Sequence, residues 1–250
     1  MHFVIEHHLK YSIIIPTLNE EKLLPELLKQ FADPALQKKF DYEIIISDGG
    51  STDNTLNIAR EFTDKIIQKH NNNFQNIAMG RNIGAQSADG DILIFLNGDV
   101  VINDPEFFFD YLEKYFLNSE YLAFTCYVWI YPEEEKISDK VFHSIYNSYF
   151  FLLNYVGVGM GRGECQVIRK DIFLKVGGYN EQCAAGEDFE LYKRIRKLGK
   201  ILFSKKVCVY ESPRRFRRFG YVGVSLSWIF NSFSVIYKKR SMHSHWEQVR

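Results

Sequence analysis

Polar side chains with the chemistry to bind a nucleotide or a metal ion follow two apolar runs near the start of the chain. Asp48 comes directly after residues 43–47, and Asn97 and Asp99 follow residues 91–96. A carboxylate at a strand end can accept a hydrogen bond from an N–H of a nucleotide base. Carboxylate oxygens are also the ligands that a hard divalent cation prefers. The alternative is turn formation, because Asp and the Asn-Gly-Asp sequence are common turn signals.

Arginines concentrate near the other end of the chain, where they occupy residues 214, 215, 217 and 218. A guanidinium group can bind phosphate oxygens in pairs, and its charge stabilises a departing diphosphate. Four arginines at this spacing cannot all face one site. We therefore expect one or two of Arg214, Arg215 and Arg217 to bind phosphate groups, and the others to face solvent or lipid.

The elements that must position these residues alternate between strand and helix. Apolar runs predict buried strands at residues 11–15, 43–47, 65–68 and 91–96. Helices are predicted at residues 20–31, 53–62, 77–88, 107–116, 171–176 and 187–198, and a further strand at 122–131. The early alternation predicts a parallel, Rossmann-like sheet with right-handed crossovers. Ligands of such sheets bind beyond the carboxyl ends of the strands.

Several segments together resemble family 2 glycosyltransferases. They are IIIPTLNE at 13–20, IISDGGSTDNT at 45–55, GRNIG at 80–84, GD at 90–91, FLNGD at 95–99, GGY at 177–179 and Glu187-Asp188. They stand in the family's order and span about residues 12–219. The resemblance implies an α/β fold of the GT-A type, with a Rossmann-like, mixed but mainly parallel sheet flanked by helices and a C-terminal helical extension.

The resemblance also implies a division of the chain. Residues 1–218 are expected to form the catalytic domain, with a nucleotide-binding half at 11–100 and an acceptor half at 101–218. Residues 219–250 are expected to form an amphipathic C-terminal extension.

By this resemblance, six residues contact the nucleotide: Pro16, Thr17, Asn19, Glu20, Asp48 and Arg81. Asn19 and Asp53 have an alternative as helix caps. Asn97-Gly98-Asp99 takes the position of the family's DXD motif, which holds Mg²⁺ or Mn²⁺ against the sugar diphosphate. Asn97 replaces the first acid, so we expect Asp99 to be the direct ligand and Asn97 to contribute a carbonyl or water-mediated contact.

Glu187-Asp188 matches the family's acidic pair near the acceptor. Inverting transfer needs a base that removes the acceptor proton as the hydroxyl attacks the anomeric carbon. The resemblance assigns this role to Asp188 and implies that Glu187 binds the acceptor or orients the site. Both residues are alternatively first-turn helix acids.

The resemblance implies an inverting enzyme that moves a sugar from a UDP- or GDP-linked donor to an acceptor hydroxyl or a polyprenyl phosphate. Its product would be a cell-surface glycan or glycolipid. A non-catalytic nucleotide-sugar-binding or scaffold protein of the same fold is the alternative. A nicotinamide-dependent enzyme is disfavoured, because no G-x-G-x-x-G follows the first strand. We expect no nucleic-acid partner.

The bulk properties suit a globular protein at the upper size limit of one α/β domain, with 250 residues and no net charge. Residues 190–250 nevertheless hold 15 of the 31 Lys and Arg but only 3 of the 31 Asp and Glu. Such a segment can meet diphosphate or anionic lipid headgroups. The four cysteines form no C-x-x-C pair, and the first ten residues lack a signal-peptide pattern. We therefore expect a cytoplasmic protein.

Residues 141–161 and 219–237 contain no Asp, Glu, Lys or Arg, but neither suits a membrane span. We expect the first to pack on the core or line the acceptor cleft. In the second, one helical face carries Val222, Leu226, Ile229, Phe230, Phe233 and Tyr237. Basic residues flank this stretch, so it suits either a peripheral helix on an anionic membrane or a terminal helix packed on the core.

Overall fold

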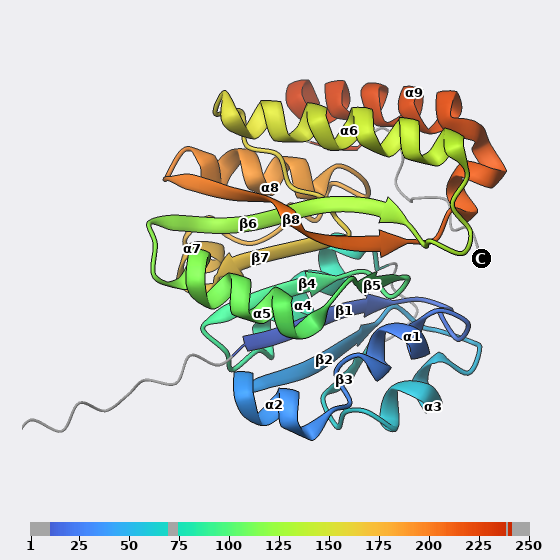
Figure 1. Ribbon diagram of the computed structural model, residues 1–250, viewed down its shortest axis with the longest axis vertical. Helices are drawn as coiled ribbons and strands as arrows, with labels where there is room; N and C mark the ends of the chain where they lie inside the picture. The colour runs from blue at the N-terminus through green and yellow to red at the C-terminus, as the bar shows by residue number, and fades with distance from the viewer. Residues whose placement is uncertain (1–10, 70–74, 239, 242–250) are drawn as a thin grey trace, which may run out of the picture.

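The computed structural model describes residues 11–69, 75–238 and 240–241. Within them, eight strands form one sheet in the order β3-β2-β1-β4-β7-β6-β8-β5. Helices cover the sheet, and α6 and α9 form an outermost layer beyond β6 and β8 (Figure 1).

The first half of the sheet is parallel. It comprises β1 (Tyr11–Thr17), β2 (Tyr42–Asp48), β3 (Ile66–Gln68) and β4 (Ile92–Leu96). The connecting helices are α1 (Leu24–Lys29), α2 (Pro34–Phe40), α3 (Thr55–Arg60) and α4 (Ile77–Gln86). β1, β2 and β4 are almost continuously apolar because both of their faces are covered.

The second half of the sheet is mixed. β7 (Cys165–Arg169) pairs antiparallel with β4 and with β6 (Tyr121–Ile130). β8 (Lys200–Glu211) pairs parallel with β6 and antiparallel with β5 (Val100–Ile102). The helices of this half are α5 (Pro105–Leu112), a π-helix η1 (Glu113–Leu117), α6 (Ile137–Tyr155), α7 (Lys170–Lys175), α8 (Glu187–Arg196) and α9 (Arg214–Lys238).

Two apolar cores lie on opposite faces of the sheet. One is built with α1, α2 and α5, and its centre is a set of stacked and edge-to-face rings around Phe109. The other is built with α4, α7 and α8. Gly84 lets α4 approach β1 closely, because a Cβ at this position would lie 2.4 Å from Ile14 Cγ2.

The structure confirms the predicted fold class, a mixed and mainly parallel α/β sheet flanked by helices with a helical C-terminus. The prediction missed α2, β5, β7, β8 and the regular helix α6. It also began the first helix too early. Asn19 has a φ of 55°, and residues 20–23 form turns before α1.

The two uncharged stretches fall in α6 and α9, which pack side by side. α6 packs on the sheet through Asn147, which bonds the backbone of Val128 in β6, and through His143, which lies near Glu211 of β8; this agrees with the core-packing expectation. α9 is interrupted at Gly220, whose φ is 68°. It buries Val224 and Val235, so the face predicted to be apolar points outward. None of the helices in the described ranges combines the length and apolar content of a bilayer-spanning helix.

Candidate active site

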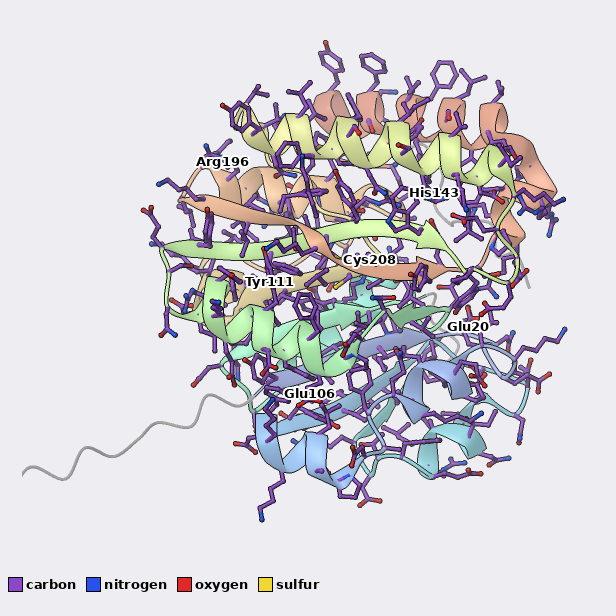
Figure 2. The ribbon with its side chains drawn as sticks, viewed as in Figure 1. Glu20, Glu106, Tyr111, His143, Arg196 and Cys208 are labelled. Atoms are coloured by element: carbon purple, nitrogen blue, oxygen red, sulfur yellow. The ribbon has the colours of Figure 1, made fainter. Side chains whose placement is uncertain are left out.

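A cavity of about 300 Å³ lies at the carboxyl ends of β1, β2 and β4. This volume is within the range of small-molecule sites. Seven residues singled out in the sequence line it: Pro16, Thr17, Glu20, Asn97, Asp99, Arg214 and Arg215. Figure 2 shows Glu20 at the edge of the sheet where β1, β6 and β8 end. The topology thus brings residues from both ends of the chain into one hollow.

On the side of the cavity next to β1 and β2, where the sequence predicts the nucleotide, short polar side chains hold the loops by hydrogen bonds. The Asp48 carboxylate accepts hydrogen bonds from the backbone N–H groups of Gly50 and Ser51, both at 2.9 Å, and from Thr17 Oγ1 at 3.1 Å. Asn19 Oδ1 accepts from the Thr52 N–H at 2.8 Å. Asp48 and Asn19 do not line the cavity themselves. In the structure they act as loop formers, which is the turn alternative for Asp48.

One arginine holds two acidic residues of the cavity together. Arg214 Nη2 lies 2.9 Å from Asp99 Oδ2 and 2.9 and 3.0 Å from the two carboxylate oxygens of Glu20. Asp99 follows β4, and Glu20 follows β1, where its backbone N–H donates to Thr55 Oγ1. Two carboxylates therefore converge on one positively charged group.

This arrangement fits a divalent cation. The described residues contain no cluster of three or more His, Cys, Asp or Glu side chains of metal-site geometry. A hard cation beside a diphosphate, however, needs only one or two protein carboxylates. Asp99 and Glu20 already surround a guanidinium nitrogen, which stands where a cation could be held. Asn97 Oδ1 accepts from Arg81 Nη2 at 2.8 Å, so its oxygen is engaged.

Arg81 links Asn97, which follows β4, to Glu187 at the start of α8. It is fully buried, and its Nη1 lies 2.7 Å from Glu187 Oε1, while its Nη2 also donates to the Gly163 carbonyl at 2.8 Å. Its guanidinium lies 5.2 Å from the centre of the Tyr179 ring. Arg81 does not line the cavity, and in this structure its polar contacts are with protein groups.

Glu187 and Asp188 begin α8 after Gly186, whose φ of 75° favours glycine. Asp188 Oδ1 accepts from the Phe189 N–H at 2.7 Å. Burial, and next the charges of Glu187 and Glu164, raise the pKa of Asp188 to about 7. Asp188 lies beside Gly163 rather than in the cavity lining. A carboxyl group with this pKa can take up a proton at neutral pH.

A second charged group, missed by sequence reasoning, lies next to Asp188. Arg162 is buried and bridges Glu164, at 3.2 and 3.4 Å, to Glu211, at 3.7 Å. Both carboxylates line the cavity. Burial raises the pKa of Glu211 well above its ordinary value, whereas Arg162 lowers the pKa of Glu164 despite its burial.

His143 lies against this group from α6, 4.0 Å from Glu211 Oε1 (Figure 2). Burial and the charge of Arg162 lower its pKa to about 4, so it is neutral at pH 7. The sequence signal for the group was the glycine-rich segment 157–163 followed by a short buried strand. Glycines at that segment lie against Tyr192 and Arg196 of α8, which places Glu164 at the cavity.

The remaining arginines of the basic run diverge. Arg215 lines the cavity next to Arg214. Arg217 instead pairs with Asp139 of α6, through bonds of 2.5 and 2.8 Å, and donates to the Glu134 carbonyl. Geometry therefore favours Arg214 and Arg215 over Arg217 for contact with a bound diphosphate.

The sequence and the fold match known proteins. The model of the family "Glycosyl transferase family 2" matches residues 12–177. The 4,4'-diaponeurosporenoate glycosyltransferase of Staphylococcus haemolyticus is 30% identical over 198 residues, which are 74% of this chain and 51% of that protein. The undecaprenyl-phosphate 4-deoxy-4-formamido-L-arabinose transferase of Proteus mirabilis is 35% identical over 105 residues, 39% of this chain and 31% of that protein. The chain thus spans about half or less of these relatives.

Solved structures show the same fold. The mannosyltransferase PcManGT from Pyrobaculum calidifontis, in complex with GDP-Man and Mn²⁺, superposes with a TM-score of 0.66 at 17% identity, over 83% of this chain and 58% of that chain. TarS 1-349 from S. aureus, in complex with UDP-GlcNAc, superposes with a TM-score of 0.59 at 17% identity, over 81% and 58%. These structures confirm the GT-A type of fold.

Proposed function

Because this chain belongs to glycosyl transferase family 2, we propose that it is an inverting glycosyltransferase. It moves a sugar from a UDP- or GDP-linked donor to an acceptor hydroxyl or a polyprenyl phosphate. The observation that carries the proposal is the cavity at the carboxyl ends of the parallel strands, where Glu20, Asp99 and Arg214 meet. Acids and arginines placed together suit a ligand that carries both a diphosphate and a metal ion.

The donor lies across the carboxyl edge of the sheet in this proposal. Pro16 and Thr17 line the nucleotide side, and Asp48 and Asn19 shape the loops around it. Arg214 and Arg215 receive the diphosphate, where their charge stabilises the leaving group. Arg81 supports the site from beneath by fixing Asn97 and Glu187.

Asp99 holds the divalent cation, Mg²⁺ or Mn²⁺, with Glu20 beside it and Asn97 as a secondary contact. When bound, such a cation neutralises charge on the diphosphate. The structure of PcManGT contains Mn²⁺ together with GDP-Man, which supports the use of a divalent cation.

Asp188 is the base that removes the acceptor proton. The acceptor oxygen forms a bond to the anomeric carbon while the bond between that carbon and the diphosphate oxygen breaks, so the configuration inverts. The proton of the hydroxyl passes to Asp188. A polyprenyl phosphate acceptor attacks through an ionised phosphate oxygen, which carries no proton for the base to remove, and the same bond to the diphosphate breaks. Glu187, tied to Arg81, orients the first turn of α8.

The acceptor in this proposal belongs to cell-surface glycan or glycolipid synthesis. Both relatives described above have names that specify lipid-like acceptors, a carotenoid acid and undecaprenyl phosphate. We place the protein in the cytoplasm, with peripheral contact at the inner face of the cell membrane.

The test is donor binding and hydrolysis across UDP-, GDP-, CMP- and dTDP-sugars with Mn²⁺, Mg²⁺ or EDTA. We expect one donor to raise the melting temperature with metal, Asp99→Ala to weaken that shift, and Asp188→Asn to abolish turnover while binding remains. Asp110→Ala and Asp171→Asn, which replace acids outside the cavity, are the matched controls. If no nucleotide sugar binds with either metal, the transferase proposal fails and a scaffold role takes its place.

A further inference from the structure

The outer side of α6 and α9 forms one apolar surface, here called the α6–α9 face. On α6, the exposed large apolar residues are Ile137, Val141, Ile145, Tyr149, Leu152 and Tyr155. On α9, they are Val222, Leu226, Ile229, Phe230, Phe233 and Tyr237. Figure 1 shows the two helices side by side as the outermost layer, and Figure 2 shows side chains standing out from it.

The helices run in the same direction, so their apolar sides form a continuous surface. Ser138 is hydrogen-bonded to Tyr221 at 3.0 Å near the start of both, and Tyr146 donates to Ser225 at 2.8 Å further along. Neither helix has an Asp, Glu, Lys or Arg between residues 141 and 155 or between 219 and 237. A contiguous uncharged apolar face that extends along two helices marks a binding surface on a globular protein.

Basic side chains lie at the far ends of the two helices. Lys238 and Arg240 are exposed at the end of α9. At the end of α6, Lys205 Nζ lies 3.6 Å from the centre of the Phe151 ring, and Arg196 Nη2 lies 3.0 Å from the position that a Gly157 Cβ would take. Figure 2 shows Arg196 at this end of the layer.

The starting ends carry charges of both signs. Lys140, Arg217 and Arg218 are exposed. Glu135 is paired with Lys140 at 3.2 Å, and Asp139 is buried against Arg217. The adjoining turn adds the exposed acids Glu133 and Glu134. An apolar middle with a basic far end is complementary to a bilayer with anionic headgroups, because the apolar side chains enter the acyl boundary while the cations of the far end meet phosphate.

The inner side of α9 borders the cavity. Trp228 lines the cavity and lies 5.3 Å from the Tyr146 ring of α6. Arg215 and Phe216, at the start of α9, line it as well. Helix α9 alone therefore separates the α6–α9 face from the proposed acceptor side of the cavity.

We propose that the α6–α9 face seats this protein on an anionic lipid bilayer. Its consequence for the acceptor rests on the proposed function: a lipid-linked acceptor enters the cavity from the bilayer, past Trp228. The seating itself requires only the surface described above.

The experiment is flotation with vesicles of phosphatidylcholine alone or of equal parts phosphatidylcholine and phosphatidylglycerol. We expect the protein to float with the anionic vesicles and less with the neutral ones. Phe230→Glu with Phe233→Glu should cut the bound fraction about tenfold, because two apolar side chains leave the acyl boundary. Lys238→Gln with Arg240→Gln should weaken binding to anionic vesicles only. The matched control, Phe107→Glu with Leu174→Glu, replaces exposed apolar residues of α5 and α7 and should float like the wild type.

Absence of flotation, or equal flotation of the Phe230/Phe233 variant and the wild type, overturns the proposal. The alternative occupant of the α6–α9 face is a second copy of the chain, and light scattering tests it. A wild-type dimer that becomes monomeric in the Phe230/Phe233 variant would make the face a contact between two copies. Thermal shift with UDP and GDP separates the two proposals. Nucleotide binding without flotation refutes only the membrane seating, and flotation without nucleotide binding refutes only the transferase.

Discussion

The two sides of the cavity are built from different kinds of contact. On the nucleotide side, Asn19 and Asp48 bond backbone groups of neighbouring loops, so the loops are shaped before a ligand arrives. On the proposed acceptor side and at the proposed diphosphate site, charged groups pair across the fold, as Arg81 does with Glu187 and Arg214 with Asp99. Uncharged and backbone hydrogen bonds between loops thus fix the shape of the site, whereas ion pairs across the fold fix its charge. In the proposed complex, the donor leaves the hydrogen bonds of Asn19 and Asp48 in place but replaces part of the ion pairs.

The largest effect is expected from removing the central ion pair. Arg81→Ala should lower the free energy of unfolding by about 3–5 kcal/mol, because it leaves the buried Glu187 carboxylate without its partner. Urea denaturation followed by circular dichroism measures this loss. Arg60→Ala, at an exposed helix end, is the control and should change stability by less than about 0.5 kcal/mol. Equal stability of the two variants would show that the Arg81–Glu187 pair does not stabilise the fold.

A second test addresses the pair that a donor must exchange. Arg214→Gln should strengthen Mn²⁺ binding in the absence of donor, because Asp99 and Glu20 lose their guanidinium partner. The same variant should bind the nucleotide diphosphate about tenfold to a hundredfold more weakly, since one charge-assisted bond is lost. Titration calorimetry measures both affinities, with the exposed Arg218→Gln as control. An unchanged Mn²⁺ affinity would mean that Arg214 does not compete with the cation.

The contrast between the two sides also explains what the sequence could predict. The strands β1, β2 and β4 and their polar ends were predictable, because continuous apolar runs stopped by Pro16, Asp48 or Asn97 follow from local chemistry. β8 was not predictable, because its consecutive lysines and partly exposed residues break the apolar pattern that marks a strand, although it lies between β6 and β5. The Arg162 group was missed for a related reason. Its partners Glu164 and Glu211 meet only after β7 and β8 take their places beside β6.

The pH dependence of turnover tests how the acceptor side sets its charge. The raised pKa of Asp188, about 7, predicts that turnover rises with pH through this value, because the base must be deprotonated. Glu164→Gln removes a negative neighbour of Asp188, so the rising limb of the pH–rate profile should move to lower pH. Rate profiles of donor turnover between about pH 5 and 9 would show this. Glu190→Gln, on the same helix but paired with Arg194, should leave the limb in place.

The smallest effect is expected on the proposed nucleotide side, where single hydrogen bonds join neighbouring loops. Asp53 accepts hydrogen bonds from the backbone N–H groups of Thr55 at 3.0 Å and Glu21 at 3.2 Å. Asp53→Ala should therefore cost about 1 kcal/mol of stability in urea denaturation, because two backbone N–H groups lose their acceptor. Asp64→Ala, an exposed loop acid, is its control.

The stabilisation by Asp53 should also depend on pH. Burial opposes ionisation of this carboxyl, but the hydrogen bonds from Thr55 and Glu21 lower its pKa below the ordinary value. A carboxyl with a lowered pKa in the folded state stabilises the protein above its unfolded-state pKa, and that contribution disappears as the pH falls through the folded value. The difference between wild type and Asp53→Ala should thus be full at pH 7 and shrink below about pH 4. A difference that stays constant down to acid pH would mean that the loop is held by shape alone, without the charge.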